Sequence, residues 1–285
     1  MTRLLPRALM APAVAALLLW MLVPLAMTLY FSSVNYNLMQ PGEHPFVGLE
    51  NFHYFVTDPD FWPAVGNTLL LIGSIVAITV VLGIGLALLV NEPFPGRGIV
   101  RVLLISPFFV IPTVNALLWK HMMMNPIYGV LANVWKFFGA TPVDWLTDAP
   151  LFSVIVMVAW QWLPFACLIF ITSLQSLDRE QMEAARMDGA NAFQRFGYLT
   201  LPHLARPMAV VIMIEMIFLL SIFAEIAITT NGGPGNASTN LTYMIFKQSL
   251  MNFDVGVASA GALFAVVLAN IVAVFLIRII GKNLD

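Results

Sequence analysis

Long apolar runs that carry almost no charge dominate the pattern of apolar and polar positions along the chain. An α-helix rises about 1.5 Å per residue, so about 20 apolar residues cross a hydrocarbon core of about 30 Å. Six runs reach that length, at about residues 8–31, 66–90, 100–123, 152–174, 208–229 and 257–280. Because lipid offers no partner to a free backbone N–H or C=O group, these spans are predicted to be helices. The predicted fold class is all-α, a polytopic membrane protein with six transmembrane helices.

Prolines and basic residues mark three places in this pattern. Pro107 and Pro112 interrupt the third run and Pro164 lies within the fourth, so these helices are expected to bend. Arg3 and Arg7 precede the first run, as in a secretory signal. That run is longer than the apolar core of about 7–15 residues in such a signal, so we predict an uncleaved first span.

The composition excludes several other classes of protein. Hydrophobic residues make up 60% of the chain and charged residues 10%, whereas soluble domains carry roughly 45–50% and about 25%. A net charge of −2 gives no basic excess for nucleic acid. The single cysteine, Cys167, lies in an apolar run and is predicted to be a buried hydrophobe. The four histidines are scattered without ligand spacing, so no metal site is expected.

The basic residues orient the predicted spans. With the N-terminus inside, ten of the thirteen Lys and Arg residues fall on the cytoplasmic side, which is the positive-inside bias. They are Arg3, Arg7, Arg97, Arg101, Arg179, Arg186, Arg195, Arg206, Arg278 and Lys282. The other side holds Lys120, Lys136 and Lys247. Both termini are therefore predicted to be cytoplasmic.

The most polar stretch of the chain is the cytoplasmic loop 176–207, between the fourth and fifth spans. Asp178 with Gln181 has the pattern of a capping box, so a helix is expected to start at about residues 177–179. Asp188-Gly189 indicates a turn, and Asn191 with Gln194 offers a second capping box. Leu201-Pro202 is expected to end the second helix. Without further information, this is a solvated amphipathic loop at the membrane surface.

The same loop resembles the EAA motif of ABC importer permeases. The resemblance rests on Glu183-Ala184-Ala185, then Asp188-Gly189-Ala190, and an ending at Leu199, Leu201 and Pro202. As in that family, the loop lies two spans before the C-terminus. The resemblance implies that residues 1–285 form one ABC transporter transmembrane domain, whose loop seats coupling helices in a cleft of a separate ATP-binding subunit. The implied coupling residues are Glu183, Ala184, Ala185, Asp188, Gly189 and Ala190.

Two further elements resemble carbohydrate-importer permeases of the maltose-permease-like branch. Residues 46–52 are similar to the FVGLxNF element of that branch, and residues 229–235 to its T-x-GGP loop. The stretch from Ala224 to the C-terminus is similar to sorbitol/mannitol-type polyol permeases. The resemblance implies a periplasmic binding protein, for which Gly232, Gly233 and Pro234 are docking candidates.

Two carboxylates lie in the fifth predicted span, Glu215 and Glu225. A charge at mid-bilayer costs about 2.5 kcal/mol or more, so such residues are expected to face inward with a function or a partner. At 100° per residue they lie some 80° from a common face, which does not indicate a joint site. Glu225 is a candidate for the substrate path or the binding protein. Glu215 is deeper and either contacts substrate or bonds across the bundle.

An aromatic and amide cluster in the third and fourth spans offers further substrate-path candidates. Trp160, Gln161, Asn115 and Trp119 supply the aromatic faces and amide groups that commonly hold sugars and polyols. The alternative is an interfacial tryptophan belt beside a helix kink.

The predicted function is import of a sugar or sugar alcohol by ATP-driven alternating access, as a permease of the bacterial inner membrane. No phosphate-binding GxxxxGK[ST] motif occurs, so the chain is predicted to be no enzyme and to bind no cofactor, with ATP and Mg²⁺ on a partner. Expected partners are a second homologous permease subunit, two ATP-binding subunits, a periplasmic solute-binding protein and the bilayer, and no nucleic acid. The alternatives are an ion-coupled secondary transporter, for which no inverted repeat is evident, and a membrane-embedded enzyme.

Overall fold

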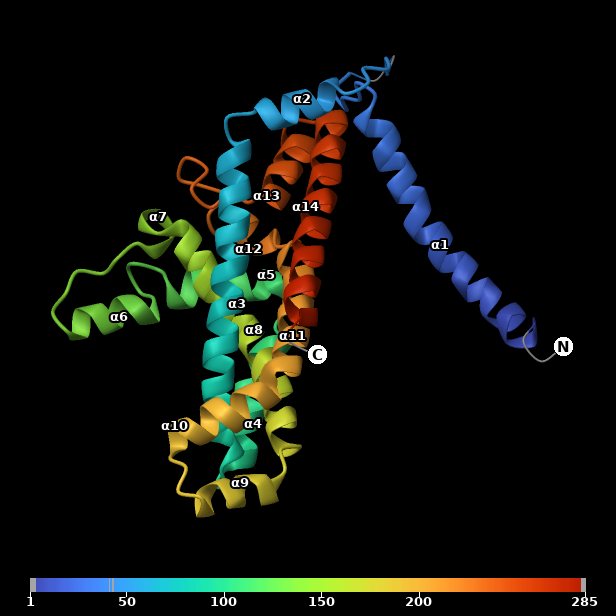
Figure 1. Ribbon diagram of the computed structural model, residues 1–285. Helices are drawn as coiled ribbons and strands as arrows, with labels where there is room; N and C mark the ends of the chain where they lie inside the picture. Colours follow the sequence, from blue (N-terminus) through green and yellow to red (C-terminus); the bar gives the residue numbers. More distant parts are fainter. Residues whose placement is uncertain (1–3, 41, 43, 283–285) are drawn as a thin grey trace. The chain divides into compact units, whose positions relative to one another are not determined.

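The computed structural model describes residues 4–40, 42 and 44–282, and these are almost entirely helical (Figure 1). Arg3, one of the residues that orient the chain, lies outside the described residues. The chain divides into two compact units, residues 1–62 with 244–268 and residues 63–243 with 269–285. No β-strand forms in the described residues, and two isolated bridges pair Val34 with Phe46 and Asn37 with Asp254.

The first unit is built on a long N-terminal helix and the start of the C-terminal one. Its elements are α1 (Leu4–Ser32), α2 (Glu50–Thr57), η4 (Lys247–Met251), the first part of α14 (Val255–Lys282) and the ends of two helices shared with the second unit. The Phe55 ring lies against Gly261, where a side chain would collide with it. Phe61 packs on Phe264 with ring centroids 4.8 Å apart. In α1, none of the most apolar window is buried, which is expected of a helix whose surroundings are lipid or another membrane subunit.

The second unit contains most of the helices. They are α3 (Phe61–Asn91), α4 (Arg97–Ile105), η1 (Ser106–Phe109), α5 (Pro112–Leu117), η2 (Leu118–Met123), α6 (Val130–Phe137), α7 (Trp145–Asp148), α8 (Pro150–Gln175), α9 (Arg179–Met187), α10 (Ala192–Arg195), η3 (Phe196–Thr200), α11 (Leu201–Leu219), α12 (Ala224–Thr229) and α13 (Leu241–Phe246). Helices α3, α8 and α11 share an apolar core that includes Ala87, Phe170, Leu204 and the buried Cys167. Helices α9 and α10 lie across one end of this bundle (Figure 1).

The number of spans agrees with the apolar pattern. Five helices of the described chain are long and apolar enough to cross a membrane, and there are six if the bent pair Arg97–Phe109 and Pro112–Met123 is counted as one span. That pair is bent by 105° at the break between its halves. Pro112 has no N–H group and begins α5, so the helical hydrogen-bond ladder cannot continue through this point. The third span is therefore broken rather than continuous.

The fifth span differs from the sequence prediction at both ends. Leu201-Pro202 does not end a helix, because helical backbone runs from Ala192 to Leu219. Pro202 lies in the first turn of α11, where its missing N–H is tolerated, directly after the wider turns of η3. At the other end the predicted span 208–229 is interrupted between α11 and α12.

Side chains from the following segment stabilise that interruption. Asn240 Nδ2 donates to the Ile222 carbonyl at 2.7 Å, and Thr242 Oγ1 donates to the Leu220 carbonyl at 2.7 Å. These bonds satisfy carbonyl groups that a continuous helix would have paired. No signal within the span itself reveals the partners, which lie about 20 residues later in the sequence.

Close packing of α3 on α8 depends on Gly83. A Cβ at this position would lie 3.1 Å from Ala166 Cβ and 3.3 Å from the Phe170 ring. We expect Gly83→Leu to lower the thermal unfolding midpoint of the detergent-solubilised protein, because overpacking costs about 1–3 kcal/mol. The matched control is Gly85→Leu, on the same helix with nothing within 4 Å of its Cβ position. Equal midpoints for the two variants would refute this packing argument.

Candidate functional site

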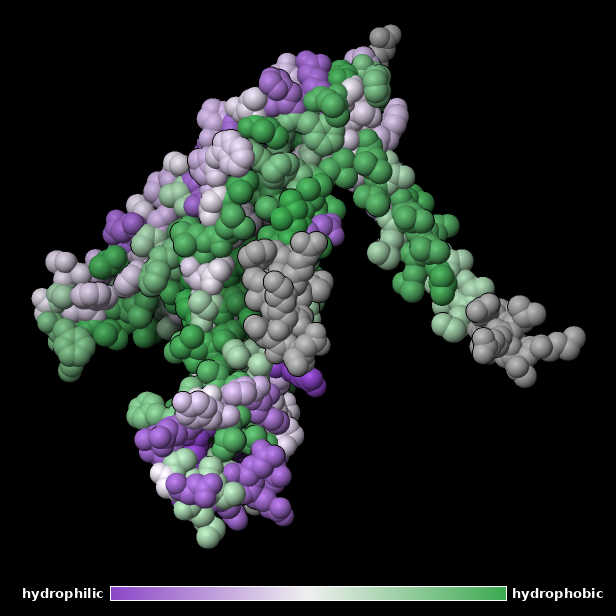
Figure 2. Space-filling view, viewed as in Figure 1, coloured by the Kyte–Doolittle hydropathy of each residue, from purple (hydrophilic) through white to green (hydrophobic). Residues whose placement is uncertain are grey.

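Loop 176–207 forms a helix, a tight turn and a second helix. Helix α9 starts at Arg179, as the sequence predicts, and the Asp178 side chain caps it by accepting from the Glu180 N–H at 2.9 Å. The predicted capping box pairs Asp178 with Gln181, but the N–H group that the Asp178 side chain accepts from is that of Glu180. Figure 2 shows hydrophilic side chains gathered over α9 and α10, and apolar surface along α3.

The backbone conformation of Gly189 and two backbone hydrogen bonds fix the turn after α9. Gly189 has a φ of 81°, a left-handed conformation that glycine adopts without steric cost. The Ala190 N–H donates to the Ala185 carbonyl at 3.0 Å and the Gly189 N–H to the Arg186 carbonyl at 3.1 Å, which is the Schellman pattern. Residues 188–190 therefore set the angle at which the chain leaves α9.

The second helix of the loop begins with the predicted capping box. Asn191 Oδ1 accepts from the Gln194 N–H at 2.9 Å, and Gln194 Oε1 accepts from the Asn191 N–H at 2.8 Å. Both ends of the turn are thus fixed by hydrogen bonds.

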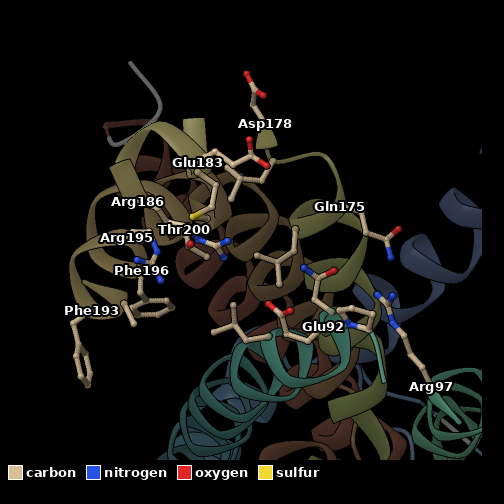
Figure 3. A pocket seen from close by; sticks show the side chains of 17 residues that line it. Glu92, Arg97, Gln175, Asp178, Glu183, Arg186, Phe193, Arg195, Phe196 and Thr200 are labelled. Atoms are coloured by element: carbon tan, nitrogen blue, oxygen red, sulfur yellow. The ribbon is translucent and has the colours of Figure 1, made fainter. Parts of the chain in front are cut away.

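A groove of about 1030 Å³ lies between loop 176–207 and the ends of α3 and α8 (Figure 3). Three carboxylates and three guanidinium groups line it: Glu92, Asp178, Glu183, Arg97, Arg186 and Arg195. Two of the arginines are anchored to backbone, Arg97 to the Val90 carbonyl at 2.8 Å and Arg195 to the Ala190 carbonyl at 2.6 Å. Of the predicted coupling residues, Glu183 alone is in the groove lining. Ala184, Asp188 and Gly189 are exposed, and Ala185 and Ala190 are half-buried.

Three large apolar side chains project from the same loop, and the sequence interpretation did not single them out. Met187 is 89% exposed, Phe193 88% and Tyr198 80%. Phe193 is one of the residues that line the groove, and its ring is directed outward in Figure 3. In a loop that is otherwise polar, exposed apolar side chains indicate an interaction surface. The signal was present in the sequence, as apolar residues that do not fit a buried face.

The two carboxylates of the predicted fifth span lie on different helices. Glu215 in α11 is fully buried, and Thr79 Oγ1 of α3 donates to its Oε2 at 2.6 Å. Its Oε1 has no hydrogen-bond partner among the described atoms. Glu225 is buried in α12, beyond the break. The hydrogen bond across the bundle, one of the two interpretations offered for Glu215, is thus present.

Four other substrate-path candidates come together at the break of the third span. Asn115 Nδ2 donates to Gln161 Oε1 at 2.8 Å, and Gln161 Nε2 donates to the Val110 carbonyl at the break itself. The Trp119 and Trp160 rings pack edge to face with centroids 5.8 Å apart. Gln161 therefore satisfies a carbonyl that the broken helix leaves free.

The segment after α12 folds into a compact glycine loop, residues 230–240. Gly232 is buried at a φ of 78°, Gly233 is half-buried, and Pro234 is exposed after a cis Gly233–Pro234 peptide bond. Asn67 Nδ2 from α3 reaches three carbonyls of this loop, including that of Thr239 at 2.9 Å. Asn67 was missed from sequence, where it is one polar residue in a long apolar helix.

The FVGLxNF element also has a structural explanation within the first unit. Asn51 Nδ2 donates to the Ser32 carbonyl at 3.0 Å and the Val34 carbonyl at 2.9 Å. Gly48 has a φ of 61°, and its N–H donates to the Ser33 carbonyl at 3.1 Å. This element fastens α2 to the end of α1.

Comparison with known proteins connects these features. The sequence family described as "binding-protein-dependent transport system inner membrane component" matches residues 79–285. A probable ABC transporter permease protein, y4oQ of Sinorhizobium fredii, is 38% identical over 87% of this chain and 81% of its own length. The trehalose/maltose transport system permease MalF of Thermococcus litoralis is 30% identical over 90% of this chain and 87% of its own.

A solved structure shares the fold. In the crystal structure of a bacterial alginate ABC transporter with a periplasmic protein bound to an alginate pentasaccharide, one chain superposes with a TM-score of 0.81. It is 23% identical, and the match covers 96% of this chain and 93% of that one. Since the family match extends over most of the chain, the protein belongs to the inner membrane components of binding-protein-dependent transport systems and is a multi-pass permease subunit of an ABC transporter.

Proposed function

We propose that this permease moves a sugar or sugar alcohol into the cytoplasm by ATP-driven alternating access. The geometry of loop 176–207 carries the proposal. Two hydrogen-bonded caps hold α9 at a fixed angle, and the chain continues from the loop directly into α8 and α11. Such a lever converts a displacement of α9 into movement of two spans.

Loop 176–207 is proposed to dock on a separate ATP-binding subunit. Met187 and Phe193 are exposed apolar anchors of the size that fills a cleft, and Glu183, one turn before Met187 on α9, is an exposed charged contact. Both termini then lie in the cytoplasm, in agreement with the distribution of basic residues. ATP and Mg²⁺ are assigned to the partner, of which the complete transporter holds two copies beside a second permease subunit.

The cargo assignment rests on the relatives and on the interior of the second unit. The Thermococcus relative is named for trehalose and maltose, and the transporter of similar fold is named for alginate. Trp119 and Trp160 are the proposed aromatic contacts for a sugar ring, and the amides of Asn115 and Gln161 are hydrogen-bonded at the break of the third span. Glu225 and Glu215 remain candidates for polar contacts along the path.

The glycine loop is the proposed contact for a periplasmic binding protein. Pro234 is exposed at its tip, next to Gly233, and Asn67 holds the loop to α3. A rigid loop binds a partner with little loss of conformational entropy.

The test is ATP-driven uptake in proteoliposomes that contain the transporter, with the binding protein supplied outside. We expect Glu183→Lys to lower uptake by about tenfold or more, because reversing a charge at an interface opposes docking. The solute affinity of the isolated binding protein should not change. Glu180→Lys, the same charge reversal one turn earlier on α9, is the matched control.

Two results would refute this function. One is uptake by the Glu183→Lys variant at the wild-type rate. The other is loss of uptake on addition of an uncoupler while ATP is maintained, which would identify an ion-coupled carrier.

A further inference from the structure

A second, smaller groove runs between α4 and α8. Its volume is about 130 Å³, and it is lined by Arg101, Leu104, Ile105, Leu168, Ile171, Thr172 and Gln175. The lining positions are spaced by three and four residues on each helix, so each helix contributes one continuous face. Gln175 also lines the larger groove under loop 176–207, as does Arg97 (Figure 3). The two grooves therefore meet at the same end of the bundle.

The groove is polar at one end and aliphatic at the other. Gln175 is the last residue of α8, and α4 begins at Arg97 on the same end, so Arg101 and Gln175 lie near the loop. Leu104, Ile105 and Leu168 lie farther along the helices, toward the middle of the spans. This order of polarity matches a phospholipid, whose charged head is followed by an acyl chain.

The guanidinium of Arg101 has hydrogen-bonding capacity left over. Its Nε is buried and has no partner among the described atoms, and its Nη2 makes a long bond of 3.4 Å to the Val90 carbonyl. That carbonyl already accepts from Arg97 Nε at 2.8 Å. An arginine carries five N–H donors, and a buried donor without a partner is costly. The Nε atom is closed off from the groove, but the Arg101 side chain is only half-buried, so an acceptor in the groove meets its Nη groups, and a negatively charged acceptor is favoured.

We propose that this groove binds an anionic phospholipid of the inner leaflet. The phosphate lies on Arg101 beside the Gln175 amide, and an acyl chain lies along Leu104, Ile105 and Leu168. Guanidinium groups match phosphate oxygens in geometry, and basic pockets at the cytoplasmic side of membrane helices bind such head groups. The volume of the groove holds the phosphate, and the acyl chain lies outside it, along exposed aliphatic side chains such as Leu168, which is 40% exposed. The assignment to the inner leaflet rests on the proposed function, which places loop 176–207 in the cytoplasm.

The test is native mass spectrometry of the full chain with its co-purifying subunits, released from nanodiscs of phosphatidylcholine and phosphatidylglycerol. We expect the wild type to retain phosphatidylglycerol, and Arg101→Gln to retain it with an affinity lower on the order of tenfold. Arg206→Gln removes an equal charge from an exposed arginine outside the groove and should retain the lipid. Leu168→Trp fills the groove while it keeps Arg101, and should release the lipid even if Arg101→Gln fails to assemble.

Three outcomes would overturn the lipid site. They are equal retention by Arg101→Gln and the wild type, equal retention of phosphatidylcholine, and release of phosphatidylglycerol by inorganic phosphate alone, which would indicate a site for a free anion. Glu183→Lys should keep the lipid although it loses uptake. Lipid retention is measured without transport, so failure of one proposal is distinguishable from failure of the other.

Discussion

We expect Gly189→Ala to lower ATP-driven uptake by about tenfold while the transporter still assembles and the isolated binding protein keeps its solute affinity. At a φ of 81°, a residue with a Cβ is strained by about 1–2 kcal/mol. No heavy atom lies within 4 Å of the Cβ position, so the strain is entirely in the backbone. Its relief turns the chain away from the Schellman geometry and breaks the bond from the Ala190 N–H to Ala185. Helix α9 then loses the angle at which it presents Glu183 and Met187.

The control for this prediction lies eight residues later in the same loop. Gly197 also has open space around its Cβ position, but its φ is not in the left-handed range. In the helical backbone of η3 an alanine is tolerated or is stabilising by about 0.5–1 kcal/mol, so Gly197→Ala should transport normally. Uptake measured in proteoliposomes with equal amounts of each variant compares the two. If both variants transported equally well, the angle of the turn would have no part in coupling.

The second large effect is expected at Gly232 in the glycine loop. This residue combines a φ of 78° with a crowded environment: a Cβ would collide with Thr239 Oγ1 and lie 2.7 Å from Tyr243 Cε1. The left-handed backbone costs an alanine about 1–2 kcal/mol and the overpacking adds about 1–3 kcal/mol. Gly232→Ala should therefore lower the thermal unfolding midpoint by several degrees. It should also abolish the stimulation of ATPase activity by the loaded binding protein.

Gly235→Ala separates the two causes of this effect. Gly235 has a φ of 55°, and nothing lies within 4 Å of its Cβ position. Its substitution brings the backbone strain without the collision, so its midpoint should fall less than that of Gly232→Ala. Equal midpoints in a thermal scan of the two solubilised variants would show that the contacts of Gly232 with Thr239 and Tyr243 do not matter.

The spans were predictable because lipid imposes a simple rule on the sequence. A stretch must be apolar for about 20 residues and must be helical, so the number and places of the spans follow from counting. The caps of loop 176–207 were predictable for a similar reason. Asp178, the Gly189 turn and the box of Asn191 with Gln194 act over a few residues, and all three are present in the structure. The roles assigned to individual residues, in binding substrate or the binding protein and in coupling to the ATP-binding subunit, remain predictions.

The breaks within spans were less predictable. Pro107 and Pro112 indicated a bend, but its angle and its stabilisation by Gln161 depend on a helix some 50 residues away. Pro202 predicts the end of a helix, whereas wider turns before it allow helical backbone to continue. The end of α11 at Leu219 depends on Asn240 and Thr242. At the break of the third span and at the end of α11, a local pattern competes with a hydrogen bond from a distant residue.

By itself, the sequence determined that this protein crosses a membrane and how its polar loop is capped, and it predicts that this loop faces the cytoplasm. Hydrophobicity, charge and short-range hydrogen bonds decide these features, and all of them act along the chain. Only the tertiary structure decided that Glu215 accepts a hydrogen bond from Thr79 and that Asn67 donates to carbonyl groups of the glycine loop. It also decided that Arg101, beside a groove, is left with an unpaired donor. These features depend on packing between helices, where one polar side chain in an apolar helix has many possible partners and the fold selects one.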